Sequence, residues 1–140
     1  MEGYEKLITY KLSLIIYDLT WDFVPQYYPL KEDYRQRDQL KQAARSIKQN
    51  ISEGSSERSL SSKLKLYDVA KSSSRELLED YRDILRREGI NQWPKNDLRL
   101  FQLRKSLENF SSNPSASFSV SSVISVLEGI RGKDDKISSQ

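Results

Sequence analysis

The sequence contains no cysteine and no histidine. Disulfide bonds, thiolate nucleophiles, zinc sites built from these residues and histidine-based acid–base catalysis are therefore excluded. A metal site made of carboxylates and a serine–lysine pair remain chemically open, but no motif points to either one. We therefore expect no metal, no cofactor and no enzymatic activity.

Glycine and proline are scarce, with five and four residues in a chain of 140. Long uninterrupted helices are therefore available to the chain. No apolar segment approaches the roughly 18–20 residues that cross a bilayer, and the first residues lack the pattern of a secretory signal. Together with the absence of cysteine, this composition predicts a soluble cytoplasmic protein of one domain.

Positive charge is concentrated in the middle of the chain. The net charge is +3 overall and +7 over residues 35–105, while both flanking segments are negative. This asymmetry is typical of a protein with an acidic partner such as RNA, DNA or an acidic protein surface. An ordinary solvated helical surface is the alternative interpretation.

Apolar residues recur at spacings of three and four along most of the chain, which predicts an all-α fold. The expected helices cover 4–23, about 31–53, about 59–88, 97–109 and 116–131. The last segment has the serines and β-branched residues of a strand, but a lone strand in a helical chain would have no partner. Residues 132–140 are polar and are expected to be disordered.

Proline, glycine and serine positions set the expected helix ends. Pro25 disfavours helical geometry in the residue before it, which ends the first helix. Gly54 stands where the second helix would need a left-handed residue to stop, and Gly89 is expected to close the third. Either Ser56 or Ser59 can serve as the N-cap of the third helix.

Basic residues on two of these helices are the candidates for contact with nucleic acid. They are Arg37, Lys41, Arg45 and Lys48 on the second helix and Arg82, Arg86 and Arg87 at the end of the third. The first four cover a band roughly 80° wide, about a quarter turn from the apolar stripe. Such a band would bind phosphates with salt-dependent affinity and little sequence specificity. Interhelical ion pairs are the alternative.

Aromatic residues widen the apolar stripe of the first helix. A stripe of this kind is more often core or subunit interface than a platform for base stacking. As a second hypothesis, the chain is a protein–protein adaptor that uses this aromatic surface. The residues of that surface would be Tyr4, Tyr10, Trp21, Tyr27 and Tyr28.

The third helix supplies the remaining chemical candidates. A serine of the run 72–74 with Lys71 as its base would make a nucleophile, but no strand–turn–helix elbow or oxyanion loop surrounds it. Close helix packing explains these serines instead. Four acids could form a hydrolase site, but they lie among arginines and resemble ordinary helix ion pairs. These acids are Glu76, Glu79, Asp80 and Asp83.

Four short motifs point to a known family. They are Tyr4-Glu-Lys-Leu7, Tyr17-x-Leu-Thr20, Ser46-Ile-x-x-Asn-Ile-x-Glu-Gly54 and Glu76-Leu77. Together they resemble the four-helix-bundle proteins of the 23S rRNA-intervening-sequence family, well over residues 4–88 and loosely over 116–131. The resemblance implies an antiparallel up-down four-helix bundle over residues 1–131, with the extra short helix placed before the last one.

The resemblance also implies a function without catalysis. Proteins of this family tend to assemble into rings, with pentamers favoured. A distant branch of the fold includes the accessory variability proteins of diversity-generating retroelements, which are basic pentamers that bind nucleic acid and a reverse transcriptase. We therefore expect a non-enzymatic oligomeric scaffold for RNA or DNA, with a polymerase or reverse transcriptase as a protein partner.

Overall fold

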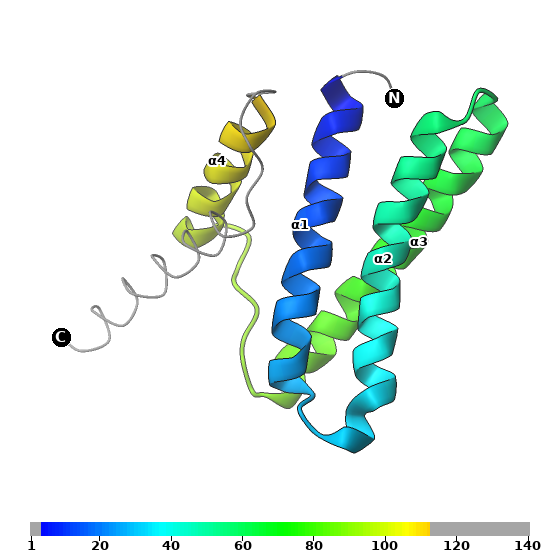
Figure 1. The fold of residues 1–140 in the computed structure, drawn as a ribbon. Coiled ribbons are helices and arrows are strands. Elements are labelled where there is room, and N and C mark those ends of the chain that lie inside the picture. Colours follow the sequence, from blue (N-terminus) through cyan, green and yellow to red (C-terminus); the bar gives the residue numbers. More distant parts are fainter. Residues whose placement is uncertain (1–3, 113–140) are drawn as a thin grey trace. The chain divides into compact units, whose positions relative to one another are not determined.

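The computed structural model describes residues 4–112, and most of them are helical (Figure 1). The elements are α1 (Tyr4–Tyr27), the short 3-10 helix η1 (Lys31–Asp33), α2 (Tyr34–Ser56), α3 (Leu60–Arg87) and α4 (Leu98–Ser112). These residues include no strand, so the predicted all-α class is confirmed for this part of the chain. The helix expected over 116–131 and the tail expected over 132–140 lie outside the described residues.

The chain divides into two compact units, Met1–Gln92 and Trp93–Gln140. The first unit contains α1, α2 and α3, and the second contains α4. The single domain expected over residues 1–131 stays a prediction, because the last helix of the expected bundle is not among the described residues.

Helix α2 packs against both α1 and α3. Earlier residues of α1 contact later residues of α2, and later residues of α1 contact earlier ones of α2. Lys48 lies over the ring of Tyr17, and Lys41 lies over the ring of Trp21. The two helices therefore run in opposite directions, as Figure 1 shows.

Helix α3 also runs opposite to α2, because Ser46 of α2 meets Ser73 of α3 while Gly54 lies beside Tyr67. The hydroxyl oxygens of Ser46 and Ser73 are 2.7 Å apart in a partly buried hydrogen bond. Small residues at this contact bring the two backbones close together. The explanation of the mid-helix serines by close packing is thus confirmed at Ser73.

The core of the first unit follows the buried face of α2, which contributes more residues to it than either neighbour does. The buried apolar residues of this core are Val24, Tyr28, Leu40, Ala43, Ala44, Ile47, Ile51, Ala70, Leu77 and Ile84. Full burial of a leucine or isoleucine contributes about 1.5–3 kcal/mol. Leu40, Ile47 and Ile51 are seven and four residues apart, which places them on one face of α2.

A buried hydrogen bond joins α1 to α3. Thr20 is fully buried, and its hydroxyl donates to the carbonyl oxygen of Ile16 at 2.7 Å. Its oxygen then accepts from the Tyr81 hydroxyl, also at 2.7 Å. Burial raises the pKa of that hydroxyl, so Tyr81 stays protonated and able to donate across the neutral pH range.

Helix α1 does not end at Phe23 as predicted, but continues through Pro25 to Tyr27. Inside a helix, proline removes one hydrogen bond and clashes with an earlier carbonyl, at a cost of about 3 kcal/mol or more. Val24 and Tyr28, on either side of it, are buried in the core, and the amide of Tyr28 donates to the Val24 carbonyl at 3.0 Å. Their burial offsets the cost of the proline.

Gly54 does not stop α2 either, since the helix continues to Ser56. Among the described residues only Gly89 has a positive φ, at 69°. A methyl group added at Gly54 would lie 2.8 Å from Cε1 of Tyr67 and 3.3 Å from Cβ of Leu66. Glycine is needed here because α3 passes so close, and a left-handed turn plays no part.

Both ends of α3 agree with the sequence analysis. Ser59 is its N-cap, and the side-chain oxygen accepts a hydrogen bond from the amide of Ser62 at 3.1 Å. Gly89 follows its C-terminal end in the left-handed conformation. The amide of Ile90 then reaches back to the carbonyl of Leu85 at 2.8 Å, which satisfies a terminal acceptor.

In the second unit, Asp97 immediately precedes α4. Its Oδ1 accepts from the backbone amide of Arg99 at 2.9 Å, and its Oδ2 accepts from the Arg99 guanidinium at 2.8 Å. These hydrogen bonds from Arg99 lower the pKa of Asp97 to about 2. The guanidinium also lies 4.3 Å from the centre of the Trp93 ring, so one arginine connects the helix to the segment before it.

The contact at Gly54 predicts the effect of a single methyl group. Gly54→Ala gains about 1 kcal/mol of helix propensity but forces Tyr67 to move, and overpacking costs about 1–3 kcal/mol. We expect a net loss of about 1 kcal/mol in the free energy of unfolding, measured by urea denaturation. Ser52→Ala, at an exposed position of the same helix, is the control and is expected to change stability little. A Gly54→Ala variant more stable than the parent would contradict the close contact.

Candidate nucleic-acid interface

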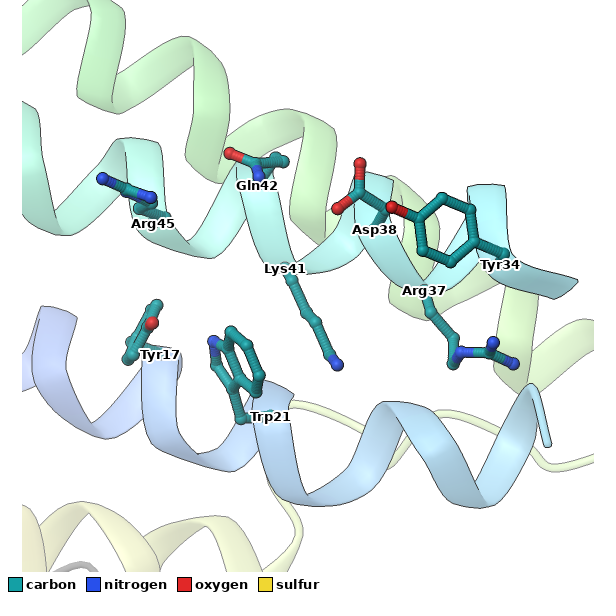
Figure 2. Close-up of a pocket in the computed structure, with 8 residues that line it drawn as sticks. All are labelled: Tyr17, Trp21, Tyr34, Arg37, Asp38, Lys41, Gln42 and Arg45. Atoms are coloured by element: carbon teal, nitrogen blue, oxygen red, sulfur yellow. The ribbon is translucent and has the colours of Figure 1, made fainter. Parts of the chain in front are cut away.

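A pocket of about 350 Å³ lies between α1 and α2 (Figure 2). Its aromatic lining is Tyr17, Trp21 and Tyr34, its basic lining is Arg37, Lys41 and Arg45, and Asp38 and Gln42 complete it. The two α1 residues are one turn apart, and the α2 residues follow spacings of three and four. Each helix therefore presents one face to the pocket.

Aromatic rings of α1 and ammonium groups of α2 meet in this pocket and beside it. The Lys41 Nζ lies 4.1 Å from the centre of the Trp21 ring, and the Lys48 Nζ lies 4.3 Å from the centre of the Tyr17 ring. The two rings are 5.9 Å apart and inclined at 52°. Figure 2 shows Lys41 extending from α2 toward Trp21. Each cation–π contact at such a site is worth about 0.5–1 kcal/mol.

The aromatic surface of the pocket remains open to solvent. Trp21 is 46% exposed and Tyr34 is 65% exposed. Tyr10 and Tyr17, on the same helix as Trp21, are instead partly buried and pack against the core. The aromatic stripe of α1 therefore has one part at the surface and another part against the core. Accessible rings beside cations can hold a planar, anionic ligand.

Three of the four basic residues predicted on α2 line this pocket, and the fourth, Lys48, lies beside it over the Tyr17 ring. Arg37 has a different role. Its Nη1 donates to the carbonyl oxygens of Tyr28 and Leu30, at 2.7 and 2.5 Å. It therefore fixes the connection between α1 and α2. Lys41, Arg45 and Lys48 take part in none of the ion pairs found among residues 4–112, so the ion-pair alternative gains no support at these three positions.

The three arginines predicted on α3 all have partners within the described residues. Arg82 pairs with Glu79 at 2.7 Å, and Arg86 pairs with Asp83 at 3.3 Å. Arg87 lies over the Tyr28 ring, 5.5 Å from its centre. The first two are exposed i,i+3 pairs of little energetic value, and they confirm the ion-pair interpretation of Glu79 and Asp83.

Arg86 and Arg87 line a second pocket, of about 260 Å³, between α2 and α3. Asp80 lies in it, and the Oδ2 of this residue is buried without a hydrogen-bond partner. Burial raises the pKa of Asp80, and the nearby charges of Glu76 and Asp83 raise it further. No group of three acidic side chains in the described residues is arranged to hold a metal ion.

The other candidates from the sequence analysis lie outside the α1–α2 pocket. Ser73 is hydrogen-bonded to Ser46, and Ser74 donates to the carbonyl of Ala70 at 2.9 Å, so both hydroxyls have partners on the helices themselves. Tyr28 is only 7% exposed, which removes it from the proposed adaptor surface. Sequence periodicity alone did not distinguish this buried ring from its exposed neighbour Tyr27.

A family model for the 23S rRNA-intervening sequence protein matches residues 5–109. The chain belongs to this family. No curated protein and no solved structure shows a significant match to it. The matched region includes both pockets and both groups of basic residues. Within residues 4–112, no helix combines the length and the hydropathy needed to cross a membrane.

The family motifs quoted above coincide with packing contacts. Thr20 joins α1 to α3, Ser46 joins α2 to α3, and Gly54 permits the close approach of Tyr67. Asn50 donates to the carbonyl of Ser46 at 2.8 Å, as expected for a side chain that bonds the neighbouring backbone. In this family member, these motif residues maintain the helix packing. Of the residues that line the pocket, Tyr17 alone belongs to a motif.

The environment of Asp80 predicts its titration. We expect NMR of the side-chain carboxyl carbon to give a pKa above 3.8 and Glu76→Gln to lower it, because one neighbouring negative charge is removed. Glu57→Gln, near the other end of α3, is the control. The pKa of Asp80 is higher in the folded protein than in the unfolded chain, so ionisation of this carboxyl lowers the free energy of unfolding as the pH rises. Below pH 3.8 the carboxyl is mostly protonated in both states, and this loss of stability is absent. A normal pKa would contradict the burial.

Proposed function

We propose that this protein is a non-enzymatic oligomeric scaffold that binds RNA or DNA through the basic face of α2. The observation that carries the proposal is a group of three cations without an acidic partner among the described residues. Lys41 and Arg45 line the α1–α2 pocket, and Lys48 lies beside it over the Tyr17 ring. Cations placed this way are available to phosphates, and releasing counterions from the nucleic acid supplies the affinity.

The other four predicted contacts carry less of this proposal. Arg37 is tied to two backbone carbonyls, and Arg82 and Arg86 already have acidic partners. Arg87 is held at the Tyr28 ring. These four residues are therefore expected to contribute little, and the direct phosphate contacts come from Lys41, Arg45 and Lys48.

The fold that we propose for the whole chain is an antiparallel up-down four-helix bundle. Helices α1 and α3 run in the same direction and both pack on α2, which fits three neighbouring corners of such a bundle. The segment 116–131 would supply the fourth corner, and α4 would be the extra short helix before it. Assembly into a ring, with a pentamer favoured, and association with a polymerase or reverse transcriptase complete the proposal.

Charge reversal on α2 tests nucleic-acid binding. The triple variant Lys41→Glu, Arg45→Glu, Lys48→Glu is expected to lose at least about a hundredfold in affinity for a labelled oligonucleotide at low salt, because three phosphate contacts become repulsive. Fluorescence anisotropy measures the affinity, and circular dichroism checks that helicity is retained.

A matched control reverses three exposed cations of α3, with Lys65→Glu, Lys71→Glu and Arg75→Glu. It has the same net charge as the first variant, so it is expected to bind several times more weakly than the parent but far more tightly than the α2 variant. Equal losses in the two variants would show that only net charge matters. Undiminished binding by the folded α2 variant would refute the proposal.

Assembly is tested by light scattering after size exclusion. A ring requires a mass several times the 16.3 kDa of one chain. Protein prepared at low salt is also expected to carry excess absorbance at the wavelength of nucleic acid, and high salt should remove it because phosphate contacts are salt-dependent. A monomer at every concentration would contradict the oligomer.

A further inference from the structure

We propose that the α1–α2 pocket takes one unpaired base of a single strand, stacked on Trp21, so that the protein prefers single-stranded to duplex nucleic acid. This inference rests on the proposed function and adds the class of nucleic acid to it. Phosphate contacts alone would not require aromatic residues at the site, whereas Tyr17, Trp21 and Tyr34 line this pocket together with its cations.

The size and exposure of the pocket suit a single base. Its volume of about 350 Å³ is close to the lower end of the range for ligand sites, about 300–1,000 Å³. Trp21 is nearly half exposed and Tyr34 is more than half exposed, so their rings are accessible without local unfolding. In a duplex the faces of the bases are covered by their neighbours, and only an unpaired base can offer a face to a recessed ring.

The Lys41 ammonium group lies over the Trp21 ring, so a base that stacks on this ring must displace it. The interaction energies favour this exchange. An exposed cation–π contact is worth about 0.5–1 kcal/mol, whereas stacking of a base on an aromatic side chain is worth about 1–3 kcal/mol. The flexible lysine side chain is therefore able to leave the ring when a base enters. Its ammonium group can then bind the phosphate of the same nucleotide.

Charges around the pocket orient the strand. Asp38 lines one part of it and would repel a phosphate there. Arg45 and Lys48 lie further along α2, beyond Lys41. The sugar–phosphate backbone would therefore follow the side of Lys41, Arg45 and Lys48, while the base edge faces Asp38 and Gln42. Both of these side chains are able to hydrogen-bond to a base edge.

The test compares Trp21→Leu and Trp21→Phe with the parent protein. The probes are a fluorescein-labelled RNA of about 12 nucleotides, the same sequence as a duplex, and an abasic oligomer of equal charge. Trp21→Leu is expected to weaken single-strand binding roughly 5- to 100-fold. Binding to the duplex, binding to the abasic oligomer and the salt dependence should not change, because the phosphate contacts remain. Trp21→Phe should retain most of the affinity.

A second measurement does not depend on changing Trp21. In the Trp93→Phe protein, Trp21 is the only tryptophan, since the chain has two. Adding the single strand is expected to quench its fluorescence, while the abasic oligomer leaves it unchanged. Quenching that is equal for both probes would overturn the stacking.

The outcomes separate this inference from the proposed function. If the single strand binds with equal affinity to the parent and to folded Trp21→Leu, the base pocket is refuted. The proposed function still stands if the α2 charge-reversal variant loses binding. Equal affinity of the parent for single strand and duplex also refutes the preference. If the parent binds none of the probes at low salt, the proposed function itself is wrong.

Discussion

The structure of the first unit depends on the close packing of α2 against α1 and α3. Ala43 and Ala44 are buried on α2, Ser46 bonds to Ser73, and Gly54 lies against Tyr67 with no room for a methyl group. Small residues let the backbones approach, so that larger apolar side chains beyond the contact can be buried. The family motif from Ser46 to Gly54 lies at this contact. The motif therefore indicates the fold more clearly than it indicates an activity.

The same packing determines where the candidate site lies. The buried stripe of α2 fixes the rotation of the helix, and a band a quarter turn away must then lie along the seam with α1. Lys41 and Lys48 consequently meet Trp21 and Tyr17. A site built at a seam between packed helices presents its side chains from fixed backbone positions, and of the lining residues Tyr17 alone belongs to a family motif.

The two basic groups differ in the charges around them. On α3, acids one turn away neutralise Arg82 and Arg86, and Arg87 lies on a tyrosine ring. On α2, Lys41 and Lys48 lie over aromatic rings, which attract them weakly and leave their charge available to another anion. This difference in local partners, more than the total charge, distinguishes a candidate binding face from an ordinary solvated surface.

The sequence by itself determined the helical class, the approximate helix limits, the cap at Ser59 and the left-handed Gly89, because local periodicity and backbone preferences govern these features. It also determined which residues share the basic band of α2.

Tertiary structure decided the rest. Burial of Val24 and Tyr28 carries α1 through Pro25, and the proximity of Tyr67, not a turn, requires glycine at position 54. The sequence pattern assigns residues to the faces of a helix, but only packing decides which face of another helix lies opposite. The meeting of Trp21 with Lys41 was therefore visible only in the folded chain.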